Sequence, residues 1–117
     1  MRRQSLNMQH YRKLRELREH LVLLPGLISY KDFDISIEIG HHEHEGTPLT
    51  LKQLLLADIA SEATVRRHLS RLIKDGLVEK KVNPKDHRSV HFILTDKSHD
   101  LFQKCVDDMT SILNELT

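Results

Sequence analysis

Apolar positions return at helical spacing at both ends of the chain. Leucines recur at three- and four-residue steps through residues 6–24, before Pro25 and Gly26, and predict a first helix. A similar stripe runs through residues 96–116 and predicts a last helix. Each of these helices is either core of the domain or half of a seam between subunits. The first helix can cover part of the last one, and a second subunit would cover more of it.

The most informative pattern lies in residues 61–76, which predict a helix with its own start and stop. Ser61 can cap the first turn, and Gly76 stands where helices commonly end in a left-handed residue. One face is apolar, and the opposite face is small near its start and basic towards its end: Ala63, Thr64, Arg67, Ser70, Arg71 and Lys74. Such a face suits a helix inserted end-first into the DNA major groove. An ordinary amphipathic helix with a basic surface is the alternative.

A shorter helix precedes this one. Residues 49–57 have an apolar face, and Thr50 is a suitable N-cap. Residues 58–60 link the two helices, with Ile59 placed to pack into the angle between them. A short helix, a tight link and a second amphipathic helix form a helix-turn-helix, although helical hairpins without DNA function look similar.

Beyond the second helix the pattern changes to two strands. Residues 77–82 and 87–95 flank a polar turn and predict a β-hairpin, a wing. The wing tip offers Lys85, His87 and Arg88 to phosphates or a minor groove. Asp86 has a structural role here, because it can accept hydrogen bonds from the turn amides or pair with Arg88.

The run GLVEKKVNPKDHRSVHFILT resembles the wing of the MarR family of bacterial regulators. That family carries an Asp-x-Arg element followed by a strand ending in Leu-Thr, and this chain has Asp86-His87-Arg88 and Leu94-Thr95 at the matching separation. The run ATVRRHLSRLIKDGLV resembles the family's recognition helix. The chain departs from the family pattern at three positions: Asn83 in place of an acid, His87 in place of an arginine, and Ser98 in place of a glycine.

The resemblance implies a mainly α fold with a small β-hairpin wing. We expect one winged helix-turn-helix domain over residues 1–117, with its DNA-binding core at 33–95 and dimerisation helices at 6–24 and 96–116. The resemblance also requires a helix over about 33–42. Local pattern favours a strand there, because Ile35, Ile37 and Ile39 alternate with polar residues.

A histidine-rich tract follows those isoleucines. His41, His42 and His44 lie among glutamates, and imidazole and carboxylate are zinc ligands. No cysteine or distant histidine pair completes a recognisable spacing, so a solvated polar loop between Gly40 and Gly46 is the favoured interpretation. A metal-responsive regulator stays as an alternative.

Composition narrows the class further. The net charge is only +1, yet residues 61–91 hold eight Lys and Arg against four Asp and Glu, and a local basic patch serves phosphate contact better than total charge. The single cysteine, Cys105, fits a reducing cytoplasm and is interpreted as a small buried hydrophobe. We find no membrane span, nucleophile–base pair, glycine-rich phosphate loop or metal tetrad, and therefore expect neither an enzyme nor a cofactor.

These patterns predict a homodimeric transcriptional regulator that binds palindromic double-stranded DNA and leaves room for a small-molecule effector. The predicted DNA-binding residues are Ser61, Thr64, Arg67, Ser70, Arg71, Lys74, Lys85, His87 and Arg88. The competing class is a winged-helix protein-interaction module that docks a partner chain and ignores DNA.

Overall fold

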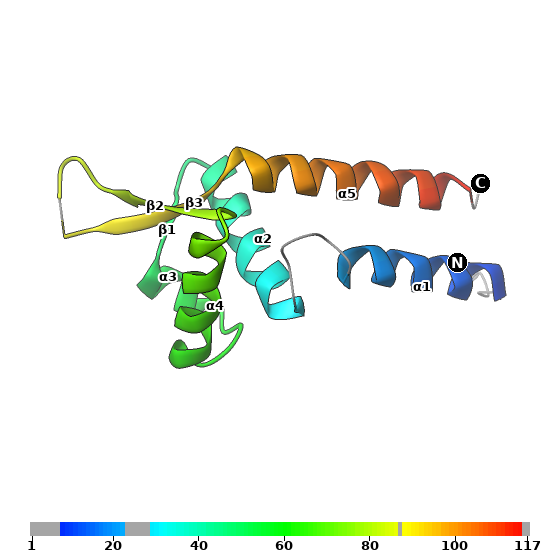
Figure 1. Ribbon diagram of the computed structural model, residues 1–117, viewed down its shortest axis with the longest axis horizontal. Coiled ribbons are helices and arrows are strands. Elements are labelled where there is room, and N and C mark those ends of the chain that lie inside the picture. The colour runs from blue at the N-terminus through cyan, green and yellow to red at the C-terminus, as the bar shows by residue number, and fades with distance from the viewer. Residues whose placement is uncertain (1–7, 23–28, 87, 116–117) are drawn as a thin grey trace, which may run out of the picture.

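The computed structural model describes residues 8–22, 29–86 and 88–115. Its elements in chain order are α1 (Met8–Val22), α2 (Tyr30–His44), β1 (Leu49–Thr50), α3 (Leu51–Leu56), α4 (Glu62–Lys74), β2 (Val78–Val82), β3 (Val90–Leu94) and α5 (Asp96–Asn114). Figure 1 shows two parts, a body of α2, α3, α4 and the sheet, and an arm in which α1 and α5 lie side by side. The extents of 54 × 31 × 27 Å reflect that arm. The predicted winged helix-turn-helix is confirmed.

The sheet has three antiparallel strands in the order β1-β3-β2. Strands β2 and β3 form the predicted wing, with Val78 opposite Leu94 at its base and Val82 opposite Val90 towards its tip. Strand β1 was not predicted, because two residues are too few to show an alternating pattern. It pairs with the middle of β3, where Leu49 lies opposite Phe92. The sheet therefore closes over the start of α3.

The residues from Ile35 to Ile39 lie in helix α2, although their alternating pattern is typical of a strand. The helix begins with a capping box, in which the Ser29 side chain accepts from the Asp32 amide and the Asp32 side chain accepts from the Ser29 amide. Ile35 and Ile39, four residues apart, are fully buried, whereas Ile37 is exposed. The strand suggested by alternation is wrong and the expected helix is confirmed, since burial follows helical spacing.

The core lies where α2, α3 and α4 meet the sheet. Five apolar side chains in this part of the described chain have no exposed surface: Ile35, Ile39, Leu54, Val65 and Leu72. Burial of each such side chain contributes about 1.5–3 kcal/mol. Ile59, in the link between α3 and α4, packs against this core as the sequence predicts. This packing holds α3 and α4 together in the helix-turn-helix.

The arm is an antiparallel pair of helices. Lys13 forms an ion pair with Glu115, and His20 Nδ1 lies 3.8 Å from Asp108 Oδ2, so the start of α1 lies beside the end of α5. Within α5, Cys105 and Ile112 are buried. Other large apolar side chains of the arm stay exposed: Met8, Tyr11, Leu14, Val106 and Leu113. No helix in the described ranges is long and apolar enough to cross a membrane.

Candidate nucleic-acid interface

Helix α4 begins and ends as its sequence predicts. The Ser61 hydroxyl oxygen accepts from the Thr64 amide at 3.3 Å, and the hydroxyl donates to Thr64 Oγ1 at 3.0 Å. At the other end Gly76 has φ of +75°, and the Gly76 and Leu77 amides donate to the carbonyls of Ile73 and Leu72. This pair of hydrogen bonds is the Schellman motif, which needs a residue that tolerates positive φ. The helix is therefore held at both ends by local contacts.

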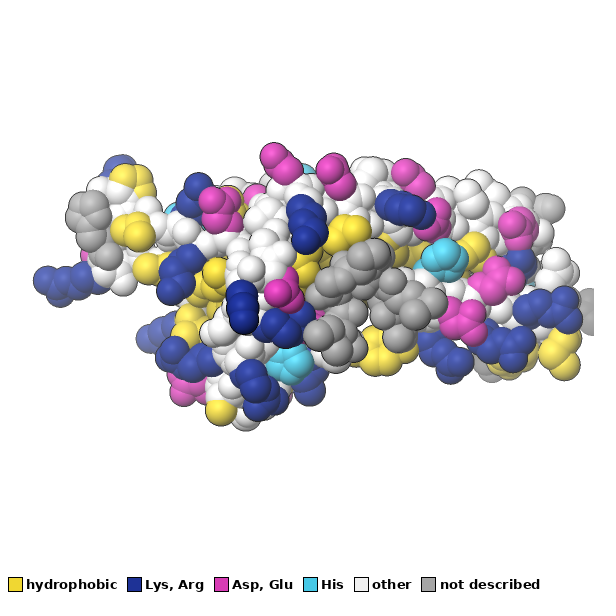
Figure 2. Space-filling model, in the orientation of Figure 1, with side chains coloured by type: hydrophobic (Ala, Val, Ile, Leu, Met, Phe, Trp, Pro, Cys, Tyr) yellow, Lys and Arg dark blue, Asp and Glu magenta, His cyan; other side chains and the backbone are white. Residues whose placement is uncertain are grey.

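The outward face of α4 is a polar and basic stripe. Arg67, Ser70 and Lys74 recur at three- and four-residue spacing and are exposed, as are Ser61 and Ala63. Thr64 is half-buried at the edge of this face. Figure 2 shows Lys and Arg side chains over α4 and the wing, and others along the arm. The stripe carries hydroxyl and basic side chains, which are the donors that contact base edges and phosphates in DNA complexes.

Arg71 does not belong to this outward stripe. Its guanidinium bonds to the Asp32 carboxylate on α2 and, at 3.1 Å, to Asp75 Oδ2. The arginine side chain is 26% exposed and Asp32 is fully buried. The sequence interpretation placed Arg71 with Arg67 because helical spacing alone cannot show that α2 covers this flank. The structure corrects that placement.

The same flank holds a residue that sequence reasoning missed. His68 Nδ1 lies 2.7 Å from Asp32 Oδ1, and its side chain is 19% exposed. His68 and Arg71 are three residues apart, so both can reach one carboxylate on a neighbouring helix. A sequence signal existed in part, since Ser29 and Asp32 have capping-box spacing and mark where α2 begins.

Two further basic residues lie between α4 and the wing. Arg66 and Lys80, both exposed, line a groove of about 250 Å³ together with Ser70 and apolar side chains. Arg66 Nη2 also contacts Glu62 Oε1 at 3.1 Å, a surface pair of small energetic weight.

The wing turn is built by its own side chains. Asp86 Oδ1 accepts from the Arg88 amide at 3.1 Å, and the Asp86 carbonyl accepts from the Ser89 amide at 2.9 Å. Asn83 Oδ1 accepts from the Lys85 amide at 2.9 Å. Asp86 thus has the turn-stabilising role that the sequence suggested, and the amide of Asn83 replaces the acid common in the resembled family. Lys85 and Arg88 are exposed, and His87 lies outside the described residues.

Contacts at the base of the wing explain why Ser98 stands where the resembled family has a glycine. Thr95 caps α5 by accepting from the Ser98 amide, and its hydroxyl donates to the Gly76 carbonyl at 2.7 Å. Ser98 is buried, and its hydroxyl donates to the Leu77 carbonyl. A glycine could not make that bond, so here the serine ties the start of α5 to the exit from α4.

The histidine tract is helical, so its interpretation as a loop is wrong. His41 and His42 each face a glutamate one turn away, at 3.2 Å from Glu45 and 3.6 Å from Glu38. The His44 ring centroid lies 6.0 Å from that of His99 on α5. No group of three or more His, Cys, Asp or Glu in the described chain is arranged to hold a metal ion.

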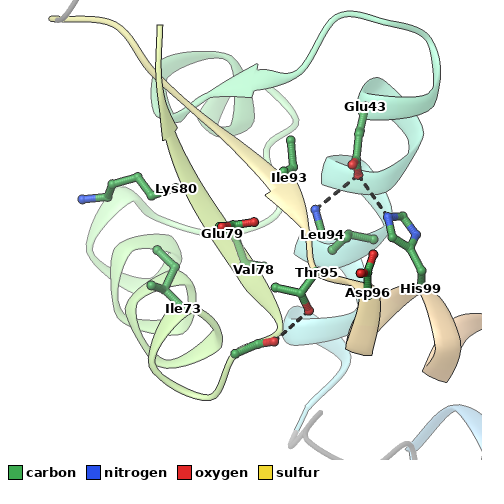
Figure 3. A pocket seen from close by; sticks show the side chains of 11 residues that line it. Glu43, Ile73, Val78, Glu79, Lys80, Ile93, Leu94, Thr95, Asp96 and His99 are labelled. Atoms are coloured by element: carbon green, nitrogen blue, oxygen red, sulfur yellow. Dashed lines mark hydrogen bonds and ion pairs between the residues drawn. The ribbon is translucent and has the colours of Figure 1, made fainter.

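Glu43, in the same tract, joins three elements beside an open pocket of about 690 Å³ (Figure 3). Its Oε2 accepts from the Leu94 amide at 3.2 Å and lies 3.6 Å from His99 Nε2. Strand β1 is too short to reach the Leu94 amide, so the carboxylate of α2 satisfies it. The glutamate therefore joins α2, β3 and α5.

The resolved pKa shifts of the described residues lie in the arm. Burial raises the pKa of the Cys105 thiol, and the Asp108 carboxylate adds to the effect. A hydrogen bond from Lys104 lowers the pKa of Asp108, and the same bond raises the pKa of Lys104. Neither change concerns a side chain of α4 or the wing.

Known proteins share this arrangement. The family described as winged helix DNA-binding domain matches residues 36–98. A mutant MarR from E. coli complexed with operator DNA is 26% identical, with a TM-score of 0.62 over 94% of this chain and 78% of that chain. A mutant MepR from S. aureus bound to an oligodeoxyribonucleotide is 22% identical, with a TM-score of 0.68 over 93% and 73%. RV1404 from Mycobacterium tuberculosis is 15% identical, with a TM-score of 0.76 over 93% and 72%. No curated protein matches this chain.

Proposed function

Because this chain belongs to the winged-helix DNA-binding domain family and is a transcriptional regulator resembling MarR, we propose that it reads specific double-stranded DNA sites as a homodimer. One observation carries the proposal: the exposed stripe of α4 and the exposed bases of the wing lie at the same end of the molecule. A helix of this width fits the major groove, and a hairpin beside it meets the adjacent minor groove or its phosphates.

Within this surface we assign sequence recognition, by contact with base edges, and backbone binding, by contact with phosphates, to different side chains. Arg67 is central in the outward stripe, and an arginine there can bond a guanine edge with two donors. Ser61 and Thr64 lie at the end of α4 that enters the groove, so their hydroxyls contact base edges or phosphates. Ser70 and Lys74 face phosphates along the rest of the helix. Lys85, His87 and Arg88 hold the backbone from the wing.

The homodimer is supported by the apolar surface left on the arm. Tyr11 and Leu14 on α1, with Val106 and Leu113 on α5, are each at least 47% exposed in the single chain. Large apolar side chains left exposed on two neighbouring helices are typical of an interaction surface. A two-fold dimer presents two copies of α4, so the preferred site is a palindrome with half-sites about one helical turn apart.

A regulator of this kind works in the cytoplasm, where its DNA is, and needs no cofactor and no catalytic step. An effector, if the chain has one, would bind near the joint between arm and body. A pocket of about 300 Å³ between α2 and α5 is lined by Ile37, Leu94 and Phe102 together with histidines. Its mixed lining suits a small, partly apolar molecule.

Selection of bound sequences from random duplex DNA tests the proposed function. A palindromic winner, bound with an affinity that falls steeply with salt, is the expected result. If no duplex is enriched and binding is independent of salt, the DNA-binding proposal fails and the winged helix is a protein-interaction module instead.

A further inference from the structure

The flank of α4 that faces α2 is organised around one buried carboxylate. Asp32 has no exposed surface, although it lies in the first turn of α2. Its oxygens accept from Arg71 Nη2, approach His68 Nδ1 at 2.7 Å, and accept from the Ser29 amide at 3.3 Å. The carboxylate thus joins the start of α2 to two side chains of the helix that we propose reads DNA.

This arrangement is costly to break. A buried carboxylate that loses its cationic partner is a charge without a counter-ion or solvating water. This costs far more free energy than the loss of the same partner from an exposed carboxylate. Arg71 is held on its other side by Asp75 at 3.1 Å, so its guanidinium lies between two carboxylates. A planar guanidinium bound in this way has a fixed direction, along the flank of α4 and towards α2.

If Arg71 were not held against α2, it would increase non-specific DNA binding. Its guanidinium could reach phosphates of any sequence, and each phosphate contact adds affinity without discrimination. Arg67, one turn away, would then compete with a second cation for the same stretch of groove. Withdrawal of Arg71 from the outward face leaves Arg67 as the arginine that meets base edges.

We propose that Asp32 is a positioning residue for sequence reading, which holds Arg71 against α2 and thereby keeps its charge off the DNA. The inference rests on the proposed function, since it concerns the same face of α4. Asp32 itself touches no DNA in this arrangement. Its effect is seen in the ratio between specific and non-specific affinity.

The central variant is Asp32→Asn, which removes the charge and keeps an acceptor oxygen for His68. Arg71, no longer drawn towards α2 by a charged Asp32, should strengthen binding to random duplex, steepen the salt slope by about one phosphate per subunit, and lower the ratio of specific to random affinity about tenfold. Asp34→Asn is the matched control, because Asp34 is an exposed aspartate on the same helix and its substitution changes net charge equally. That control should leave the ratio and the slope unchanged.

Two further variants separate withdrawal of a charge from a merely structural role. Arg71→Gln should lower the melting temperature, because Asp32 loses a partner, but should leave the salt slope as in the wild type. Asp32→Asn combined with Arg71→Gln should regain the discrimination lost in Asp32→Asn, since the freed guanidinium is gone. A structural role for Asp32 predicts no such rescue.

The measurement is fluorescence anisotropy on the selected site and on random duplex across a series of salt concentrations, with melting temperatures by circular dichroism. If Arg71→Gln weakens both duplexes and flattens the slope as Arg88→Ala does, Arg71 contacts phosphate and the inference is wrong. Unchanged discrimination in Asp32→Asn, or a double variant that is not rescued, would also overturn it. If the wild type binds no duplex, the proposed function and this inference fail together, whereas any of the other outcomes overturns the inference alone.

Discussion

Gly40 of α2 packs directly against Leu94 at the end of β3. A β-carbon on residue 40 would lie 2.8 Å from Leu94 Cδ1, closer than non-bonded carbon atoms approach each other. Leu94 is itself buried, and its amide is bonded to Glu43 one turn further along α2. The C-terminal part of α2 is therefore in close contact with β3, while Asp32 at its other end contacts His68 and Arg71 of α4.

The first prediction follows from this contact. Helix propensity alone favours alanine over glycine by about 1 kcal/mol, so Gly40→Ala would be expected to stabilise an isolated helix. In this protein we expect a net loss of about 1–2 kcal/mol, because overpacking displaces Leu94. Urea denaturation measures it. Ser111→Ala, at an exposed position of α5, is the control and should be neutral or slightly stabilising; a stabilised Gly40→Ala would show that the sheet and α2 pack less closely.

The second prediction concerns the proposed dimer. Leu113 is 47% exposed in the single chain, whereas Ile112 is 7% exposed. Leu113→Glu should therefore yield a folded monomer at micromolar concentration, since the charge is buried only in the dimer. Ile112→Glu should lower the stability of the chain itself as well. Sedimentation velocity and thermal melting distinguish the two effects.

A matched control lies on the opposite side of α5. Ser111→Glu introduces the same charge at an exposed position away from the apolar stripe, and should leave the dimer intact. A wild-type mass of one chain at high concentration would contradict the dimer, as would a Leu113→Glu variant that sediments as the wild type does.

The third prediction distinguishes a residue that recognises bases, Arg67, from one that binds the phosphate backbone, Arg88. Arg67→Ala should reduce affinity for the selected site more than for random DNA, because a bidentate arginine–guanine pair discriminates by about 1–3 kcal/mol. Arg88→Ala should weaken both duplexes similarly and flatten the salt slope by about one phosphate per subunit. The turn itself should survive, since Asp86 bonds to the backbone amide of residue 88, which alanine retains.

Affinity titrations at several salt concentrations, on matched and random duplexes, test both arginines. Asp86→Ala is the companion variant, because it removes the turn contact and leaves the basic side chains of the wing in place. It should weaken binding with an unchanged slope. Equal losses on both duplexes for Arg67→Ala would place Arg67 on phosphate and not on a base.

The fourth prediction concerns Cys105. Burial raises the pKa of its thiol, so the folded chain keeps the proton to higher pH than the unfolded chain does. Stability should be complete below the ordinary thiol pKa and should fall as pH rises through the raised value, because only the unfolded state ionises readily. Alkylation by iodoacetamide near neutral pH should be slow until denaturant is added. Rapid labelling of the native protein would contradict the buried, protonated thiol.

Local sequence was enough to predict several parts of the fold. The Ser61 cap, the Gly76 stop and the Thr50 cap each depend on residues within about one turn, so their bonds can be anticipated from residue type and spacing. The wing turn is similar, since Asp86 bonds to an amide two residues away. The two helices of the helix-turn-helix and the hairpin were therefore predictable before any tertiary contact was known.

Other features depend on segments that are distant in the chain. The isoleucine run is helical because Ile35 and Ile39 fill a core completed by α4 and the sheet, and strand-like alternation carries no information about that core. Strand β1 exists because β3 passes beside it. The short capping signal at Ser29 was present in the sequence, but its acid also serves a second partner that local pattern does not reveal.

The sequence by itself determined that α4 is an amphipathic helix with a basic outer side and that a hairpin follows it. Only the tertiary structure decided which of its bases face outward. Arg67 and Arg71 are equivalent in residue type and one turn apart, yet Asp32 comes beside Arg71 from 39 residues earlier in the chain. A side chain's direction is set by the energy of its contacts, and a buried carboxylate outweighs the helical spacing that would otherwise leave both arginines in solvent.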